Sequence, residues 1–242
     1  MDYQDVLAAV GAGSAHPGGM NSTVSWMKHI PWQPEMKVLD AGCGTGRTLL
    51  TIQQRYGCSI TGVDIREAML KKARKRTELL HGEAVWARGS VEALPLPDDA
   101  FDVVITESVN VFVDPVQALQ EVYRVSKPSG YYVDVEMFLL APVPEEWKLS
   151  ASRVYGVKHV PDLSGWKRYY RKAGFQDIKV LSTQPVKPEA AFAVSAEFPD
   201  EIDLGEKNVY KNPKVLEVLW ANSNWMESNS RFLGYGIFLC RK

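Results

Sequence analysis

The segment VLDAGCGTG, residues 38–46, constrains the fold of this chain more than any other stretch. Its apolar beginning predicts a buried strand that turns directly into a helix. Gly42 and Gly44 permit a tight turn and let a ligand approach the backbone closely, because they carry no side chain. The first turn of the following helix offers free N–H groups. The segment therefore predicts a strand–loop–helix unit that holds a small ligand, although such a turn can also serve packing alone.

Strands and helices alternate along the rest of the chain. Helices are predicted at 47–56, 66–80, 115–126 and 164–173, with two more at 2–10 and 22–30. Strands separated by helices of this length require crossover connections and therefore a parallel sheet. The sequence thus predicts an α/β fold. The seven predicted strands lie at 36–40, 59–64, 84–88, 102–106, 131–137, 176–181 and 234–240.

Two stretches interrupt this alternation. Residues 139–163 contain three prolines and are predicted to form a loop or cap. Residues 184–231 form a second insertion with one predicted helix near 215–226. No linker divides the chain, so we expect a single domain. It would comprise a helical N-terminal cap at 1–35, a ligand-binding core at 36–138, and the two insertions as a lid over an acceptor.

Composition excludes several classes of protein. The chain is 45% hydrophobic and 24% charged, which is typical of a globular protein with a substantial core. A net charge of -1 argues against a broad surface for nucleic acid, so no such partner is expected. The basic run at 71–76 falls on a predicted surface helix and is interpreted as a solvated face. No apolar run approaches the ~18 residues of a membrane-spanning helix, and no membrane partner is expected.

The cysteines indicate neither a disulfide framework nor a metal site. Cys43, Cys58 and Cys240 are odd in number, far apart and without C-x-x-C spacing. The first residues carry acids where a secretory signal would carry positive charge. The expected location is a reducing cytoplasm.

Two acids follow the first two core strands. Asp40 ends the strand before the glycine loop, and Asp64 ends the next strand. Their separation is close to the roughly 20-residue offset of a ribose-binding carboxylate in nucleotide-binding folds. Asp64 would accept hydrogen bonds from ribose hydroxyls, unless it merely caps the helix that follows.

These motifs, taken together, resemble class I S-adenosylmethionine-dependent methyltransferases. VLDAGCGTG resembles their first motif and VDIREAML their second, while GSVEALPLPDDAFDVVITE resembles the adenine-binding segment and fourth strand. The loop is G-x-G-x-G, not the G-x-G-x-x-G of dinucleotide enzymes. The resemblance covers residues 36–138 and is strongest to the small-molecule branch that includes ubiquinone-biosynthesis-like enzymes. It implies a Rossmann-like three-layer sandwich, a seven-stranded sheet with the last strand antiparallel, and S-adenosylmethionine as the cofactor.

The family pattern implies a role for each matching residue. Asp40 would organise the loop and the ammonium side of the cofactor, and Ile65 would pack on the adenine. Ser90 and Val91 would border the adenine amine, and Glu107 would lie near the methionine part. The implied cofactor-binding residues are Asp40, Gly42, Gly44, Gly46, Asp64, Ile65, Ser90, Val91 and Glu107.

Two of these roles have a plain alternative. Relatives commonly carry Asp where Ser90 stands, and Ser90 accepts a hydrogen bond without a charge or is an ordinary loop residue. Glu107 is either a cofactor neighbour or a structural partner of a backbone amide.

Methyl transfer from a sulfonium is an in-line displacement, so the protein must chiefly position the acceptor, which lowers the barrier by roughly 7–11 kcal/mol. A base is needed only if the nucleophile arrives protonated. His16 in AHPGG is our catalytic hypothesis, as a group that borders the acceptor and takes its proton; the alternative is a histidine bonded to nearby backbone. The residues expected to contact the acceptor, unless they serve only packing, are Asn110, Trp147, Tyr155 and His159.

Three functions remain open at this point. The first is methylation of a small molecule on N, O or C. The second is methylation of RNA or protein, and the third is cofactor binding without catalysis. A nicotinamide dehydrogenase is disfavoured by the glycine spacing. The acceptor, the methylated atom and the oligomeric state stay undetermined.

Overall fold

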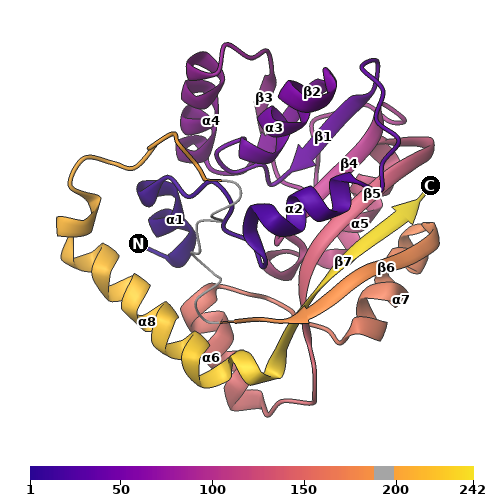
Figure 1. Ribbon diagram of the computed structural model, residues 1–242. Helices are drawn as coiled ribbons and strands as arrows, with labels where there is room; N and C mark the ends of the chain where they lie inside the picture. The colour runs from indigo at the N-terminus through magenta and orange to yellow at the C-terminus, as the bar shows by residue number, and fades with distance from the viewer. Residues whose placement is uncertain (188–198) are drawn as a thin grey trace.

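A seven-stranded sheet runs through the centre of the computed structural model, which describes residues 1–187 and 199–242 (Figure 1). The strand order is β3-β2-β1-β4-β5-β7-β6. All pairs among β1 to β5 are parallel, and β7 is antiparallel to both of its neighbours. This confirms the predicted sheet with its last strand antiparallel. The strands are β1 (Lys37–Ala41), β2 (Ser59–Asp64), β3 (Val85–Arg88), β4 (Phe101–Glu107), β5 (Ser126–Leu139), β6 (Gln176–Pro185) and β7 (Leu233–Arg241).

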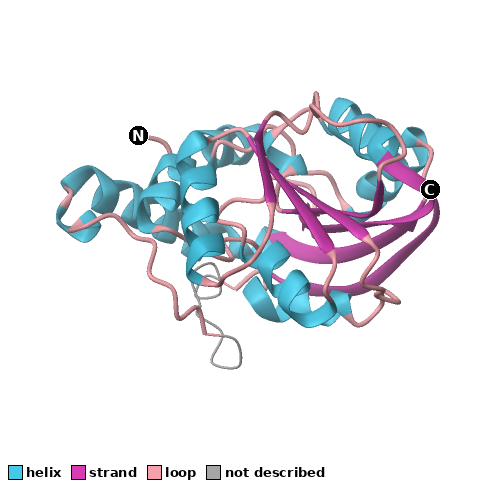
Figure 2. Ribbon diagram, turned by 90° about the horizontal axis from the view of Figure 1, so that it is seen from above, coloured by secondary structure: helices cyan, strands magenta, loops and turns pink. Residues whose placement is uncertain are grey.

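Helices cover both faces of the sheet, which gives three layers (Figure 2). The α-helices are α1 (Tyr3–Val10), α2 (Gly19–Met27), α3 (Arg47–Tyr56), α4 (Glu67–Leu79), α5 (Pro115–Val125), α6 (Glu145–Tyr155), α7 (Leu163–Ala173) and α8 (Pro213–Asn229). α3 and α4 pack together against β1, β2 and β3, and α5 and α7 pack together against β5 and β6. The central strands are consequently buried on both faces and consist of continuous apolar runs, as in Val103–Ile105 of β4.

Local signals explain where several helices begin and end. Asp114 caps α5, because its side chain accepts hydrogen bonds from the N–H groups of Val116 and Gln117, and Pro115 occupies the first turn. α3 ends at Gly57, which adopts the left-handed conformation that favours glycine. Both boundaries agree with the prediction from the sequence.

Two predictions about local structure were wrong. Residues 139–163 were expected to form a loop or cap without a helix of their own, but α6 occupies Glu145–Tyr155. Its buried stripe of Trp147, Ala151 and Tyr155 has helical spacing, which the flanking prolines obscured. The helix expected at 22–30 begins instead at Gly19, because Gly18 adopts a left-handed conformation and turns the chain into α2.

Three helices outside the sheet layers, α1, α6 and α8, pack against one another (Figure 1). Val6 and Ala9 of α1 form a small apolar cluster with Val209, which precedes α8, and with Val215 in the first turn of α8. Within the described ranges, no helix combines the length and apolarity that crossing a bilayer requires. Residues of α1 and α6 line the candidate site, which lies at the ends of β1, β2 and β4.

Candidate functional site

The glycine loop after β1 is shaped by backbone contacts. Gly42 and Cys43 donate hydrogen bonds to the carbonyl oxygen of Val63 in β2, at 2.7 and 3.0 Å. Gly42 has a positive φ of 97°, and a Cβ there would overlap the side chain of Val109. Gly44 also has a positive φ, but a Cβ at this position would meet only open space. The loop thus presents bare backbone to a cavity.

Gly46 serves the turn rather than the cavity lining. It is the residue before α3, its φ is 76°, and a Cβ there would collide with the ring of Trp86. It therefore fixes how α3 leaves the loop. It was expected to bind the cofactor with the other two glycines, but it does not line the cavity.

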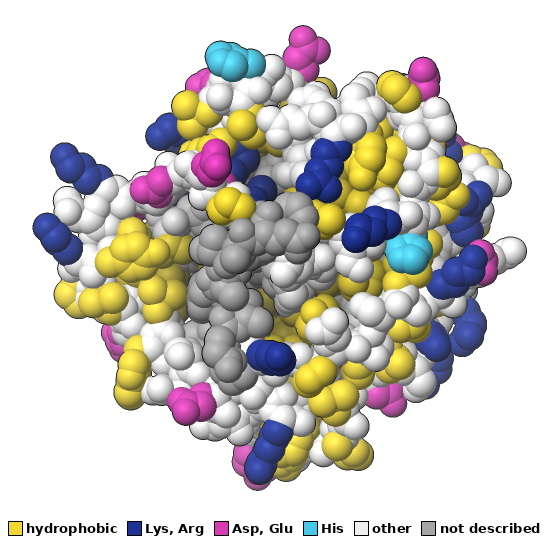
Figure 3. Space-filling view, viewed as in Figure 1, with side chains coloured by type: hydrophobic (Ala, Val, Ile, Leu, Met, Phe, Trp, Pro, Cys, Tyr) yellow, Lys and Arg dark blue, Asp and Glu magenta, His cyan; other side chains and the backbone are white. Residues whose placement is uncertain are grey.

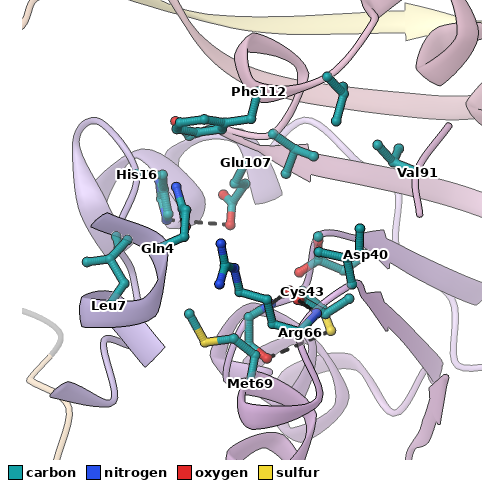
Figure 4. Close-up of a pocket in the computed structure, with 18 of the residues that line it drawn as sticks. Gln4, Leu7, His16, Asp40, Cys43, Arg66, Met69, Val91, Glu107 and Phe112 are labelled. Atoms are coloured by element: carbon teal, nitrogen blue, oxygen red, sulfur yellow. Dashed lines mark hydrogen bonds and ion pairs between the residues drawn. The ribbon is translucent and has the colours of Figure 1, made fainter. Parts of the chain in front are cut away.

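Three acids converge because β2, β1 and β4 are neighbours in a parallel sheet. Asp40, Asp64 and Glu107 stand at or near the carboxyl ends of these strands and line one cavity of about 400 Å³. Open parallel sheets bind ligands at such strand ends. Figure 4 shows Asp40, Glu107 and His16 reaching this cavity from separate segments, with Arg66 and Met69 on another side.

Asp64 is held by backbone donors. Its Oδ2 accepts a hydrogen bond from the Gly44 amide at 2.9 Å, and its Oδ1 accepts one from the Arg66 amide at 2.8 Å. Burial raises the pKa of this carboxyl above its usual value, although these hydrogen bonds and the Arg66 charge oppose the shift. Asp64 does not cap α4, because the helix begins after Arg66 without a side-chain cap.

Asp40 is a buried carboxyl with an unsatisfied oxygen. Its side chain is 3% exposed, and Oδ1 has no hydrogen-bond partner among the described residues. Burial, together with the nearby charges of Glu107 and Asp64, raises its pKa well above the usual range. A buried polar atom without a partner is costly, so the position favours a cationic or hydrogen-bond-donating group from a ligand.

Glu107 connects three segments of the chain. Its Oε1 accepts hydrogen bonds from Thr23 Oγ1 at 2.7 Å and from Trp26 Nε1 at 2.9 Å, both on α2. Its Oε2 accepts one from Thr48 Oγ1 of α3 at 2.7 Å. The partners are side chains and not a backbone amide, which was the alternative for this residue.

His16 lies against Glu107 and is only 6% exposed. Its Nε2 is 3.5 Å from Glu107 Oε2 and 3.3 Å from Thr23 Oγ1, and its Nδ1 is 3.4 Å from Ser22 Oγ. The Thr23 hydroxyl donates to Glu107 and the Ser22 hydroxyl donates to backbone carbonyls. Both ring nitrogens thus have oxygen atoms as neighbours, and a base role requires one of these contacts to open.

The remaining cofactor candidates also line the cavity. Ser90, Val91 and Ile65 border it, and Ile65 is 62% exposed. Ser90 Oγ accepts a hydrogen bond from the Glu92 amide at 3.1 Å, so the hydroxyl helps to shape its own turn.

Of the four residues expected to contact an acceptor, only Tyr155 lines this cavity. Asn110 is fully buried and turned away: its Nδ2 donates to Thr106, Tyr132 and Asp134. Trp147 lines a separate hollow between α6 and α8. His159 is exposed and lies beside the hydroxyl of Tyr169, 3.2 Å from its Nε2.

Sequence reasoning missed several residues of the lining, among them Gln4, Arg66 and Phe112. Arg66 is ion-paired with Asp2 at 2.8 Å and also with Asp5, which ties the start of α1 to the end of β2. Arg66 stands two residues after the end of β2, and this position could have marked it as a candidate for the cavity lining. The acids of α1 gave none, because they are also its capping residues.

A cluster of charged residues near the cavity was also missed. The buried Arg76 donates to Asp200 Oδ1 at 2.7 Å and Oδ2 at 2.9 Å, and its Nε donates to the Thr45 carbonyl at 3.1 Å. Arg47 lies 3.7 Å from Asp200 and donates to Ser14 Oγ at 3.2 Å. The cluster thus joins the second insertion and the N-terminal segment to the glycine loop.

Comparison with known proteins gives a consistent result. Residues 39–134 match a family model described as a methyltransferase domain. An uncharacterized methyltransferase, YodH of Bacillus subtilis, is 31% identical over 99% of both chains. Demethylmenaquinone methyltransferase of Lysinibacillus sphaericus is 35% identical over 56% of this chain and 57% of its own length.

Solved structures show the same fold at low identity. Phosphoethanolamine N-methyltransferase 2 of Haemonchus contortus, in complex with S-adenosyl-L-methionine, superposes with a TM-score of 0.74 at 20% identity. That match covers 99% of this chain and 57% of the other. The MccD protein superposes with a TM-score of 0.71 at 17% identity, covering 94% and 99%.

Proposed function

Because this chain belongs to the class I S-adenosylmethionine-dependent methyltransferases, we propose that it methylates a small-molecule acceptor. S-adenosylmethionine is the methyl donor of this family. The observation that carries the proposal is the single cavity in which the glycine loop, Asp40, Asp64 and Glu107 meet. Its volume of about 400 Å³ lies within the range of ligand pockets.

The residues present fit this cofactor. The unpartnered oxygen of Asp40 suits the ammonium group, and the open backbone at Gly44 suits the amino-acid part. Asp64 would accept the ribose hydroxyls, while Ile65 and Val91 would border the adenine. Glu107 would stand near the methionine part, held there by Thr23, Trp26 and Thr48.

When bound, the cofactor supplies an activated methyl group on a sulfonium. The chain's own residues must then hold the acceptor in line and exclude water. His16 and Phe112 border the cavity and can orient the acceptor. We assign His16 first to positioning, because both of its ring nitrogens already contact neighbouring groups.

We further propose that the parts outside the core cover the acceptor. The cap at 1–35 contributes α1 and the buried His16. The insertion at 139–163 contributes α6, and the insertion at 184–231 contributes α8; its residues 188–198 lie outside the described part of the chain. The mutual packing of α1, α6 and α8 supports their action as one lid.

Methylation of RNA or protein is the second candidate, and surface charge argues against it. On the face in Figure 3, Lys and Arg side chains are interspersed with acidic and apolar groups. The net charge of the whole chain is -1. Relatives named for demethylmenaquinone and phosphoethanolamine also favour a small acceptor.

A reducing compartment such as the cytoplasm suits the cysteines. Cys43, Cys58 and Cys240 are all free and buried. Burial raises the pKa of each thiol, which keeps it in the unreactive protonated form.

Calorimetric titration with S-adenosylmethionine, S-adenosylhomocysteine and NAD tests the cofactor site. We expect micromolar binding of both sulfur compounds and none of NAD. Asp64→Ala should weaken binding at least tenfold, because a ribose partner and the tie to Gly44 are both lost. Asp177→Ala, an exposed carboxylate on β6, is the matched control and should bind like the parent protein. Equal affinity in the Asp64 and Asp177 variants would remove Asp64 from the site.

The acceptor class is tested with methyl-labelled S-adenosylmethionine and a cell extract divided into small molecules, RNA and protein. We expect label in the small-molecule fraction, and at least tenfold less of it at limiting cofactor when Asp64→Ala replaces the parent protein. Label confined to RNA or protein would reverse the proposal. Cofactor binding without label in any fraction would favour a non-catalytic binding protein.

A further inference from the structure

The segment that follows β4, residues 108–113, forms one wall of the cofactor cavity. Four of its residues line the cavity: Ser108, Val109, Phe112 and Val113. Phe112 borders the space that the proposed function assigns to the acceptor. The carbonyl oxygen of Val111 accepts a hydrogen bond from the Lys158 amide at 2.8 Å, which attaches the residues after α6 to the same segment. The course of segment 108–113 therefore shapes the acceptor side of the cavity.

A carboxyl of β5 holds this segment by its backbone. Oε1 of Glu136 accepts hydrogen bonds from the amides of Val109 and Asn110, at 2.6 Å each. The side chain of Glu136 is fully buried, so bulk water does not reach it. Buried amides without an acceptor are costly. Loss of this carboxyl would therefore force the segment to shift.

The start of the segment is also held in an unfavourable conformation. Ser108 has a φ of 59°, in the left-handed region that residues other than glycine rarely adopt. Its amide donates a hydrogen bond to the carbonyl oxygen of Val135 at 2.7 Å. Two consecutive residues of β5, Val135 and Glu136, thus bind the three consecutive amides of residues 108–110. Such a backbone conformation persists only when the surrounding contacts impose it.

The cofactor side of the cavity has separate restraints. The glycine loop is held by β2, through the carbonyl oxygen of Val63 and the side chain of Asp64. The two sides meet where Val109 packs on Gly42, because a Cβ at Gly42 would overlap the side chain of Val109. β2 therefore fixes the loop that faces the cofactor, and β5 fixes the segment that faces the acceptor.

We propose that Glu136 is a positioning residue for methyl transfer, which sets where the acceptor stands relative to the cofactor by holding the backbone of segment 108–113. Glu136 itself does not line the cavity, so it acts through that segment. In-line transfer depends closely on position, and a misplacement of about 1 Å can cost about 10²-fold in rate. This inference rests on the proposed function and adds a residue to its machinery.

Glu136→Ala removes the acceptor of both amides. The probe is methyl-labelled S-adenosylmethionine with the small-molecule fraction of a cell extract. We expect the maximal rate of labelling to fall at least tenfold. The Kd for S-adenosylhomocysteine, measured by calorimetry, should stay within threefold of the parent value, because β2 still holds the glycine loop. An unchanged rate, or equal losses of rate and affinity, would overturn the proposal.

Asp102→Ala is the matched control for a loss of stability away from the cavity. Oδ2 of Asp102 also accepts a backbone hydrogen bond, from the Lys37 amide at 2.8 Å. This contact lies at the amino ends of β4 and β1, whereas the cavity lies at their carboxyl ends. We expect the control to keep the parent's maximal rate. If it lost as much rate as Glu136→Ala, with both proteins folded by circular dichroism, Glu136 would serve stability alone.

Glu136→Gln tests whether the two hydrogen bonds are the cause. Glutamine keeps an oxygen that can accept from both amides, and its NH₂ group replaces Oε2, which has no partner among the described residues. Burial and the charge of Asp134 raise the pKa of Glu136 well above its usual range, so an uncharged side chain is a suitable replacement. We expect a maximal rate within threefold of the parent. A loss as large as that of Glu136→Ala would contradict the proposal.

Glu136→Asp serves if Glu136→Ala does not fold. Pairing with β4 and β7 fixes the backbone of β5, so a carboxyl one methylene shorter no longer reaches both amides. Its maximal rate should also fall at least tenfold. Binding of S-adenosylhomocysteine and labelling by the parent protein are measured first: their absence contradicts the proposed function. Their presence, with equal rates for Glu136→Asp and the parent, contradicts only this inference.

Discussion

Glu107 illustrates what can be predicted at the scale of single residues. Its place at the end of a strand beside Asp40 and Asp64 follows from the alternation of strands and helices, because parallel strands bring their carboxyl ends together. The hydrogen-bond partners of Glu107 could not be predicted from the sequence. Thr23 and Trp26 come from a helix that precedes the core, and no periodicity in the sequence relates that helix to β4.

The prediction at this scale concerns His16. Because its ring nitrogens contact Ser22, Thr23 and Glu107, we expect His16→Gln to lower kcat less than tenfold and to raise the KM for S-adenosylmethionine. Loss of a general base would instead cost ~10²–10⁴-fold in rate. Initial rates against pH, with the labelled acceptor fraction, distinguish the two.

The exposed His159 provides the control, and His159→Gln should resemble the parent protein in both parameters. A hundredfold drop in kcat for His16→Gln, with KM unchanged and the pH profile altered, would make His16 the group that takes the proton.

At the scale of elements, the sequence predicted the helices and strands of the core, but it did not predict the paths of the segments outside the core. The bounds of α3 and β2 match the prediction because caps and buried apolar runs are local signals. α6 was missed because a helix of eleven residues between prolines resembles a loop in composition. The path of the second insertion depends on Asp200 meeting Arg76, a contact across 124 positions that leaves no local pattern.

The Arg76–Asp200 pair gives a prediction about the second insertion, which contains Asp200. Burial alone would raise the pKa of Asp200, but hydrogen bonds and charge from Arg76, with the charge of Arg47, outweigh burial and lower it. Asp200→Asn leaves a buried guanidinium without its counter-charge. We expect the free energy of unfolding to fall by about 2 kcal/mol and S-adenosylmethionine to bind less tightly.

Chemical denaturation and calorimetry measure both effects. Glu145→Gln is the control, because its ion pair with Lys148 is exposed on both sides and such pairs contribute little. If Asp200→Asn were as stable as Glu145→Gln and bound the cofactor equally well, the ion pair of Asp200 with Arg76 would have no part in fixing the second insertion.

At the scale of the whole molecule, two carboxyls lie in the middle of the sheet. Asp134 and Glu136 of β5 are fully buried, and Asp134 accepts hydrogen bonds from Thr106, Asn110 and Tyr170. Glu136 Oε1 accepts hydrogen bonds from the amides of Val109 and Asn110, at 2.6 Å each. The network ties the loop after β4 to the sheet, and it makes the stability of the fold depend on pH.

Burial raises the pKa of Asp134 from 3.8 to about 6, against the opposing hydrogen bonds. Between these values the folded protein holds a proton that the unfolded chain has released. The stabilisation from this group is therefore complete below the lower value and is lost as the pH rises through the upper one. Relative to Asp134→Asn, the parent protein should lose about 1.4 kcal/mol of stability per pH unit across this window. Denaturation profiles at several pH values test this; a difference that does not vary with pH contradicts it.

The position of β7 has a consequence for how the protein is made. β7 follows every other strand in the chain, yet it lies inside the sheet, between β5 and β6. While a ribosome is still adding residues 233–241, β6 has no partner and one edge of β5 is bare. The nascent chain thus exposes two unpaired strand edges until β7 has been made, a period in which association with other nascent chains competes with folding.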